Sequence, residues 1–103
     1  MIHVIATIEV HPGKRDAFLE EFRKIMPTVR AETGCLEYGP AVDFPSDIAA
    51  QTPIRENVVT IVEKWDSLDA LKAHLAAPHM AEYRNRVKDI VQSVQLQILQ
   101  PVS

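Results

Sequence analysis

Apolar and polar residues alternate along the start of the chain, from Ile2 to Val10. Every even position in this segment is apolar, and the odd positions include His3, Thr7 and Glu9. A period of two is typical of a β-strand with one buried face, because successive side chains point to opposite faces. The segment Ile2 to Val10 therefore predicts a strand.

A different spacing follows the Pro-Gly turn. Apolar residues recur every three or four positions between about Lys14 and Thr33, which predicts a long helix with one apolar stripe. The stripe consists of Phe18, Phe22, Ile25, Met26 and Val29. Proline inside a helix removes a hydrogen bond and clashes with the preceding turn, so we expect a kink between Arg23 and Pro27 rather than two helices. Gly34 can adopt the left-handed conformation that commonly ends a helix.

Two further strands are predicted, joined by a hairpin with a long tip. The segments are Cys35 to Asp43 and Asn57 to Trp65. Between them, Phe44 to Glu56 is rich in Pro, Ser, Asp and Gln, which is loop composition. One face of the strand from Asn57 to Trp65 carries Val59, Ile61, Glu63 and Trp65.

The last third of the chain predicts a broken helix and a final strand. Ser67 can cap a helix that runs to about Ala76, and Asp69 lies in its first turn, where the helix dipole favours negative charge. Pro78 starts a second helix, whose apolar stripe consists of Met80, Tyr83, Val87, Ile90 and Val91. The final strand ends at Pro101 and alternates Val94, Leu96 and Ile98 with Gln95, Gln97 and Leu99.

The predicted order is strand, helix, strand, strand, broken helix, strand. This is the ferredoxin-like split βαββαβ pattern, an α+β fold in which helices cover one face of an antiparallel sheet. The chain has 103 residues and a mass of 11.6 kDa, which fits a single domain over residues 1–103. Apolar residues such as Ile5, Val58 and Val62 would face water on the other face, so we expect a homodimer packed sheet to sheet.

Composition and charge narrow the classes of partner. A net charge of −3 and a pI near 5.7 provide no basic surface for nucleic acid. No apolar run approaches the ~18 residues that span a bilayer, and no signal-peptide pattern precedes the first strand, so we expect a cytoplasmic protein without membrane contact. Cys35 is the only cysteine, and we interpret it as a small buried hydrophobe. No metal-binding motif, phosphate loop or dinucleotide fingerprint is found, so we expect no metal and no cofactor.

The segment from Glu63 to Met80 contains the candidate chemistry. It brings the only tryptophan and two of the four histidines to a junction between a strand and a helix. Trp65 is either a core aromatic or a cavity wall with a free indole N–H. A buried Glu63 must be hydrogen-bonded or paired, and it is either a structural anchor or a general base. His74, on the apolar side of its helix, is either a satisfied core group or a catalyst.

His79 and several residues outside this segment have plainer interpretations. His79 follows a proline at a helix start and can be a first-turn residue that is partly exposed. Tyr83 is interpreted as core packing with a hydroxyl tip, and Arg84 as a partner for an acid such as Glu63. The acids of the first helix, Glu32 among them, alternate with basic residues on a face that we interpret as solvated.

Three runs of sequence together resemble the antibiotic biosynthesis monooxygenase family of small dimeric ferredoxin-like proteins. They are Gly34-Cys35-Leu36-Glu37-Tyr38, then Glu63-Lys64-Trp65 followed by Ser67, Ala70, Leu71 and His74, and then Pro78-His79. The resemblance covers nearly the whole chain except the loop from Pro45 to Arg55. It implies a dimer with a cavity between sheet and helices in each subunit.

Some members of that family oxidise quinols or polyketide anthrones with O₂ and need no metal or flavin. The resemblance therefore implies a cofactor-independent monooxygenase acting on a small aromatic substrate, with His74 and His79 as the catalytic residues that move protons. Histidine suits such a step because its ordinary pKa of ~6.5 is near working pH. Trp65, Tyr83 and Glu63 are the substrate-binding candidates, with Trp65 and the two histidines expected to line the cavity.

Two other functions stay open at this point. Heme-degrading relatives share the tryptophan and histidine pattern but carry an asparagine on the first strand, where this chain has Ala6 and Thr7. A dimer that binds a small ligand without catalysis is the second alternative, because a widely reused fold does not by itself determine a reaction.

Overall fold

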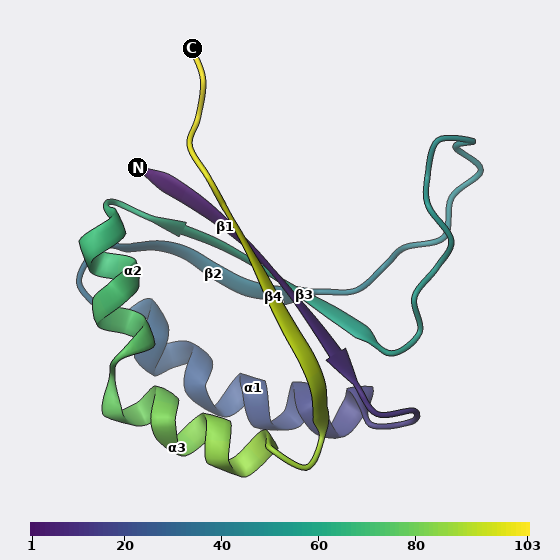
Figure 1. Ribbon diagram of the computed structural model, residues 1–103, viewed down its shortest axis with the longest axis horizontal. Helices are drawn as coiled ribbons and strands as arrows, with labels where there is room; N and C mark the ends of the chain where they lie inside the picture. The colour runs from purple at the N-terminus through teal and green to yellow at the C-terminus, as the bar shows by residue number, and fades with distance from the viewer.

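Four antiparallel strands form one sheet in the computed structural model, which describes residues 1–103, and three helices lie against one face of that sheet (Figure 1). The elements are β1 (Ile2–Val10), α1 (Arg15–Arg30), β2 (Cys35–Ala41), β3 (Val58–Trp65), α2 (Leu68–Leu75), α3 (Pro78–Val87) and β4 (Val91–Leu99). The strand order is β2-β3-β1-β4. The predicted α+β, ferredoxin-like βαββαβ arrangement with a broken second helix is confirmed.

Cross-strand register places the even-numbered side chains of β1 on the face that the helices cover. Val4 lies opposite Glu63, and Ala6 lies opposite Ile61. These residues join the apolar stripes of the helices in one core, whose largest fully buried side chains include Trp65, Phe18, Phe22, Leu71 and His74. The alternation predicted for β1 and β3 is therefore confirmed.

α1 is a single helix that continues through Pro27 and buries its predicted stripe against the sheet. It ends at Arg30, three residues before the predicted end at Thr33. Gly34 does adopt a left-handed conformation, with φ of 83°, but it lies in the turn that leads into β2. The residues between Arg30 and β2 thus form a turn over the end of the sheet, and Glu32 lies in this turn.

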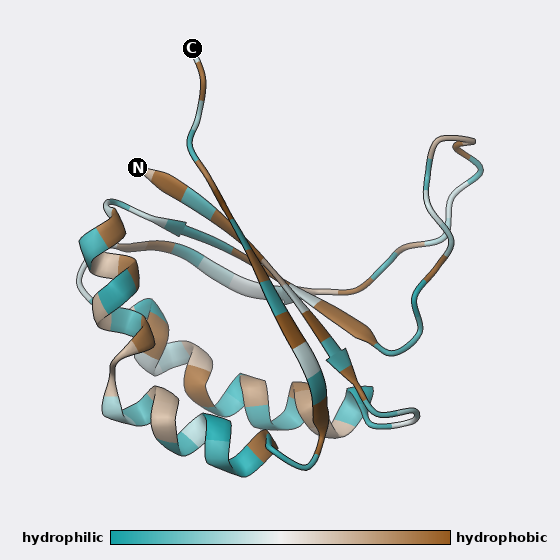
Figure 2. Ribbon diagram, in the orientation of Figure 1, coloured by the Kyte–Doolittle hydropathy of each residue, from teal (hydrophilic) through white to brown (hydrophobic).

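The boundary between α3 and β4 differs from the prediction. Ile90 and Val91 were expected on the helix, but α3 ends at Val87 and Val91 begins β4. A spacing of three or four residues fits both a last helical turn and the start of a strand, so periodicity alone cannot separate them. β4 is an edge strand. Its helix-side residues Val94 and Leu96 are 55% and 43% exposed, so the helices do not cover this strand. Hydrophobic and hydrophilic residues alternate along it (Figure 2).

On the opposite face of the sheet, two of the three apolar residues expected to face water are partly exposed. Ile5 and Val62 lie opposite each other there and are half-buried, as predicted for that face. Val58 shares the face but is only 6% exposed, so it adds little to a water-facing patch.

None of the three helices has the length and apolar content that crossing a membrane requires.

The predicted hairpin tip between β2 and β3 is present, and β2 ends at Ala41, two residues before the predicted Asp43. The connecting segment projects away from the sheet (Figure 1). Two bonds of 2.9 Å join the Arg55 guanidinium to the carboxylate of Asp43 at the base of this loop, and they lower the pKa of Asp43 to about 2.

Candidate functional site

A cavity of about 470 Å³ lies between the helices and the sheet. Its lining is mainly hydrophobic, and its four polar or charged lining residues are Glu63, His74, Arg84 and Lys88. The exposed β4 residues Val94 and Leu96 also line it, so the cavity is open to solvent beside the edge strand. A mostly apolar hollow of this size with a few polar groups is typical of a site for a small organic molecule.

Glu63 is the only carboxylate in the cavity lining. It points from β3 toward the helices, and its Oε1 accepts a hydrogen bond of 2.9 Å from the indole N–H of Trp65. Burial raises the pKa of Glu63 to about 7, with the bond from Trp65 acting in the opposite direction and the nearby charge of Glu32 adding to the effect of burial. Glu63 can therefore be neutral or ionised near neutral pH.

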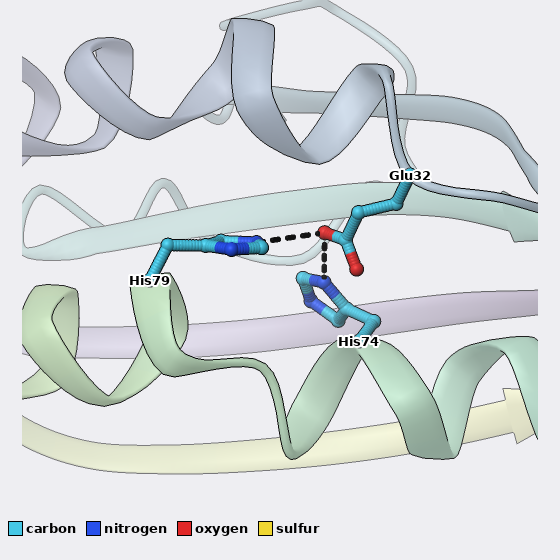
Figure 3. A group of neighbouring side chains, drawn as sticks. All are labelled: Glu32, His74 and His79. Atoms are coloured by element: carbon cyan, nitrogen blue, oxygen red, sulfur yellow. Dashed lines mark hydrogen bonds and ion pairs between the residues drawn. The ribbon is translucent and has the colours of Figure 1, made fainter.

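His74, His79 and Glu32 form a second polar group next to the cavity, shown in Figure 3. The Nδ1 atom of His74 lies 2.8 Å from Glu32 Oε2, and the Nε2 atom of His79 lies 3.1 Å from the same oxygen. An ionised carboxylate only accepts hydrogen bonds, so both ring nitrogens donate. One carboxylate oxygen thus fixes the tautomer of two imidazoles.

This arrangement leaves Nε2 of His74 as a proton acceptor. The ring is neutral at pH 7, because burial lowers the pKa of His74 although the carboxylate of Glu32 acts in the opposite direction. Nε2 forms no hydrogen bond in the protein. Every fully enclosed side-chain nitrogen and oxygen atom does have a partner, so Nε2 is not fully enclosed. Since His74 lines the cavity, its free lone pair is available to a molecule bound there.

Three elements hold the cluster in place. The hydroxyl of Ser67 accepts the N–H of Ala70 at 3.1 Å and starts α2, as predicted, so that His74 comes two turns later. The ring of His74 packs against those of Trp65 and Tyr38, with centroids 4.8 and 5.4 Å away. Contacts with two aromatic rings restrict the orientation of the imidazole.

The turn after α1 and the start of α3 supply the other two groups. The backbone N–H of Glu32 donates to the carbonyl of Val29 at 2.9 Å, which shapes the turn at the end of α1. Pro78 occupies the start of α3, where a missing N–H has no consequence, and His79 follows it in the first turn. His79 is therefore a first-turn residue, and its side chain is 26% exposed.

Two tyrosines complete the wall of the cavity. Tyr38 and Tyr83 are buried, both line the hollow, and both pack against the ring of Phe22. Burial raises the pKa of each phenol, so both hydroxyl groups stay protonated. They can donate hydrogen bonds but cannot act as anionic bases near neutral pH.

The structure brings the five predicted site residues into one region but gives them different positions. Glu63, His74 and Tyr83 line the cavity. Trp65 does not, because it is fully buried behind His74, and its indole N–H is bound to Glu63 rather than free. His79 is also outside the lining, and its ring approaches the carboxylate oxygen that it shares with His74 from another direction (Figure 3).

Two predictions about charged residues were wrong. Arg84 does not pair with Glu63, and instead its Nη2 donates to the carbonyl of Leu75 at 2.6 Å at the end of α2. Glu32 does not lie on a solvated face, because its side chain is only 15% exposed and joins both histidines. Glu32 was missed because its partners lie more than forty positions away in the sequence.

Comparison with known proteins agrees with this fold. The family model for antibiotic biosynthesis monooxygenase matches residues 1–86. YgiN of Escherichia coli (strain K12), named a probable quinol monooxygenase, is 42% identical over 103 residues and 98% of each chain is covered. The solved structure of PA3566 from Pseudomonas aeruginosa has a TM-score of 0.81 at 25% identity, covering 99% of this chain and 94% of its own.

A second solved structure, Rv0793 from Mycobacterium tuberculosis, has a TM-score of 0.79 at 25% identity, covering 99% of this chain and 95% of its own. The family match and the sequence relative support a monooxygenase, which acts on a small molecule together with O₂. This chain belongs to the antibiotic biosynthesis monooxygenase family.

Proposed function

We propose that this protein is a monooxygenase that oxidises a small aromatic quinol-like or anthrone-like substrate with O₂ and needs neither a metal nor a flavin. The observation that carries the proposal is the unpaired Nε2 of His74 at the wall of a largely apolar cavity, held as an acceptor by Glu32. The name of the relative YgiN, a probable quinol monooxygenase, supports the same substrate class.

The reaction balances with the substrate as the only reductant. His74 Nε2 removes a proton from the substrate, and the resulting carbanion-like anion forms a carbon–oxygen bond with O₂ to give a hydroperoxide. Loss of the second proton from that carbon breaks the oxygen–oxygen bond, so that one oxygen stays as a carbonyl and the other leaves as water. An anthrone thereby gives up four electrons to one O₂ and becomes an anthraquinone.

The cavity supplies the other requirements of this chemistry. Glu63, with one oxygen held by Trp65, has its other oxygen free to bond a substrate hydroxyl. The apolar walls limit the contact of the anion with water, which slows simple reprotonation. Glu32 stabilises the imidazolium that forms on His74, and the same carboxylate oxygen holds the partly exposed His79 beside it.

We also propose that the working unit is a homodimer packed through the face of the sheet that carries no helices. Ile5 and Val62 are cross-strand neighbours on that face and are only half-buried in one chain. A small domain gains stability by covering such residues.

The experiment is oxygen uptake by metal-free protein supplied with a reduced naphthoquinol or an anthrone. Uptake should exceed that of buffer alone, and ¹⁸O₂ should label one oxygen of the product. Catalase distinguishes the enzyme from spontaneous oxidation, because autoxidation releases peroxide and the proposed reaction releases water. If no quinol or anthrone increases the uptake, while ligands still quench the fluorescence of Trp65, the protein binds a small molecule without oxidising it.

A further inference from the structure

The Glu32, His74 and His79 cluster has a composition that the proton chemistry does not require. It offers one carboxylate oxygen and two imidazole nitrogens, and these three atoms lie within 4.8 Å of one another (Figure 3). They come from three separate elements, namely the turn after α1, α2 and the first turn of α3. A hydrogen-bonded base needs one carboxylate and one imidazole, so the second imidazole needs its own explanation.

We propose that this cluster binds a divalent transition-metal ion of the Zn²⁺ class. Two imidazoles and one carboxylate are a donor set that suits Zn²⁺, Co²⁺, Ni²⁺ or Cu²⁺, whereas Ca²⁺ and Mg²⁺ prefer oxygen ligands alone. Three protein ligands leave one tetrahedral position for water, as in other open zinc sites.

The spacing of the donor atoms is close to that of a coordinated set. Zinc binds such atoms at about 2.0–2.2 Å, so two ligands of a tetrahedral ion lie roughly 3.3–3.5 Å apart. The two distances to Glu32 Oε2 are 2.8 and 3.1 Å, so the carboxylate has to retreat by a few tenths of an ångström. The two ring nitrogens start no more than 4.8 Å apart, and His79, which is exposed on one side, can rotate toward His74.

An ion can reach the cluster from solvent without opening the fold. The side chains of His79 and Glu32 are 26% and 15% exposed, while that of His74 is 2% exposed and forms the inner wall. The carboxylate offsets part of the charge of the ion, which limits the penalty for placing a cation beside a buried ring.

Binding has a consequence for the reaction, and this consequence rests on the proposed function. Coordination uses the lone pair of His74 Nδ1, so the proton on that atom has to move to Nε2. Nε2 then carries hydrogen and can no longer accept a proton from the substrate. The ion should therefore inhibit oxygen uptake, and the metal-free protein is the active form.

Binding is tested with untagged, EDTA-stripped protein by calorimetry with Zn²⁺ and by the visible absorption of added Co²⁺. We expect one ion per chain and the intense spectrum of tetrahedral Co²⁺. His79→Ala and Glu32→Gln should each weaken binding at least about tenfold, while the exposed controls His11→Ala and Glu20→Gln should not. Because His79 is partly exposed, its variant should fold even if a change at Glu32 does not.

Absence of saturable binding would overturn the proposal, and so would binding that is lost in His11→Ala but retained in His79→Ala. Inhibition is measured separately, as Zn²⁺-dependent loss of oxygen uptake that EDTA restores. If Zn²⁺ binds and uptake continues, the metal site stands and the role of His74 as the base is wrong. If metal-free protein takes up no oxygen, the proposed function fails, and the binding data still decide the metal site.

Discussion

Glu32 and His74 are 42 positions apart in the sequence, and the carboxylate of one accepts a hydrogen bond of 2.8 Å from Nδ1 of the other. The bond determines which ring nitrogen of this buried histidine carries the free lone pair. A neutral imidazole has one donor and one acceptor, so fixing the donor on one side fixes the acceptor on the other. The proposed chemistry depends on this pair.

Replacing His74 by alanine should lower oxygen uptake about 10²–10⁴-fold, the range expected for loss of one positioned proton acceptor. His11→Ala, which changes an exposed histidine, should leave the rate unchanged. Circular dichroism checks that each variant is folded. A loss of less than threefold in a folded His74→Ala protein would make His74 a core residue only.

Glu32→Gln should reduce kcat about 10–100-fold with little change in KM. Glutamine can still accept a hydrogen bond from one imidazole, but it lacks the charge that stabilises an imidazolium, and hydrogen bonds to charged groups contribute about 1.5–3 kcal/mol. Steady-state kinetics with the same quinol measures both constants. Glu20→Gln, an exposed change on α1, is the control, and an unchanged kcat in Glu32→Gln would mean that the carboxylate does not support the base.

Glu63 should make the protein less stable as pH rises from about 4.5 to about 7. Burial raises its pKa from 4.5 to about 7 in the folded state, so the folded chain holds a proton that the unfolded chain has already released. The contribution of Glu63 to the unfolding free energy falls across this interval and is constant above it. The difference between the two pKa values corresponds to a loss of at most about 3 kcal/mol.

Urea denaturation at several pH values measures this effect as the difference between wild type and Glu63→Gln. Glutamine does not titrate, so its unfolding free energy should lack this part of the slope. Equal slopes in the two proteins would show that Glu63 has an ordinary pKa in the folded state.

Light scattering should report a mass near twice 11.6 kDa if the dimer forms as proposed. Val62→Lys places a charge opposite Ile5 on the half-buried face and should shift the protein toward the monomer. Ala73→Lys adds the same charge to an exposed position on α2 and should not. A wild-type monomer at micromolar concentration would remove the dimer from the proposal.

Hemin should bind weakly or not at all. Ala6 lines the cavity and Thr7 points to the other face, so β1 offers no asparagine amide to a heme. Titration with hemin tests this through the Soret band. A shifted band with sub-micromolar affinity that disappears in His74→Ala would favour the heme-degrading alternative.

Local periodicity was sufficient to predict most of this fold. The alternation in β1 and β3 and the stripe on α1 arise because each element has one face toward the core, so sequence spacing carries the information directly. The same argument correctly placed Glu63, His74 and Tyr83 on the inward face. It could not separate the end of α3 from the start of β4.

Contacts between distant segments were not predictable in this way. Glu32 resembles any surface acid beside Arg30, and only the turn after α1 brings it to the two histidines. Arg84 was assigned to an acid because unlike charges attract, but its guanidinium reaches the free carbonyl at the end of α2. Such choices depend on the path of the backbone between elements, which single-residue patterns do not encode.

The turn that carries Glu32 lies directly against the start of α2 at Gly34. A Cβ atom at Gly34 would come within 2.5 Å of Asp66 Oδ1 and 2.7 Å of Ala70 Cβ, and the φ angle of 83° is unfavourable for any other residue. A side chain at Gly34 would therefore push the turn away from α2 and move the carboxylate of Glu32 away from the imidazole of His74. A misplacement of about 1 Å can slow a reaction about 10²-fold. A substitution at Gly34, which does not line the cavity, should therefore slow the proposed reaction by displacing Glu32.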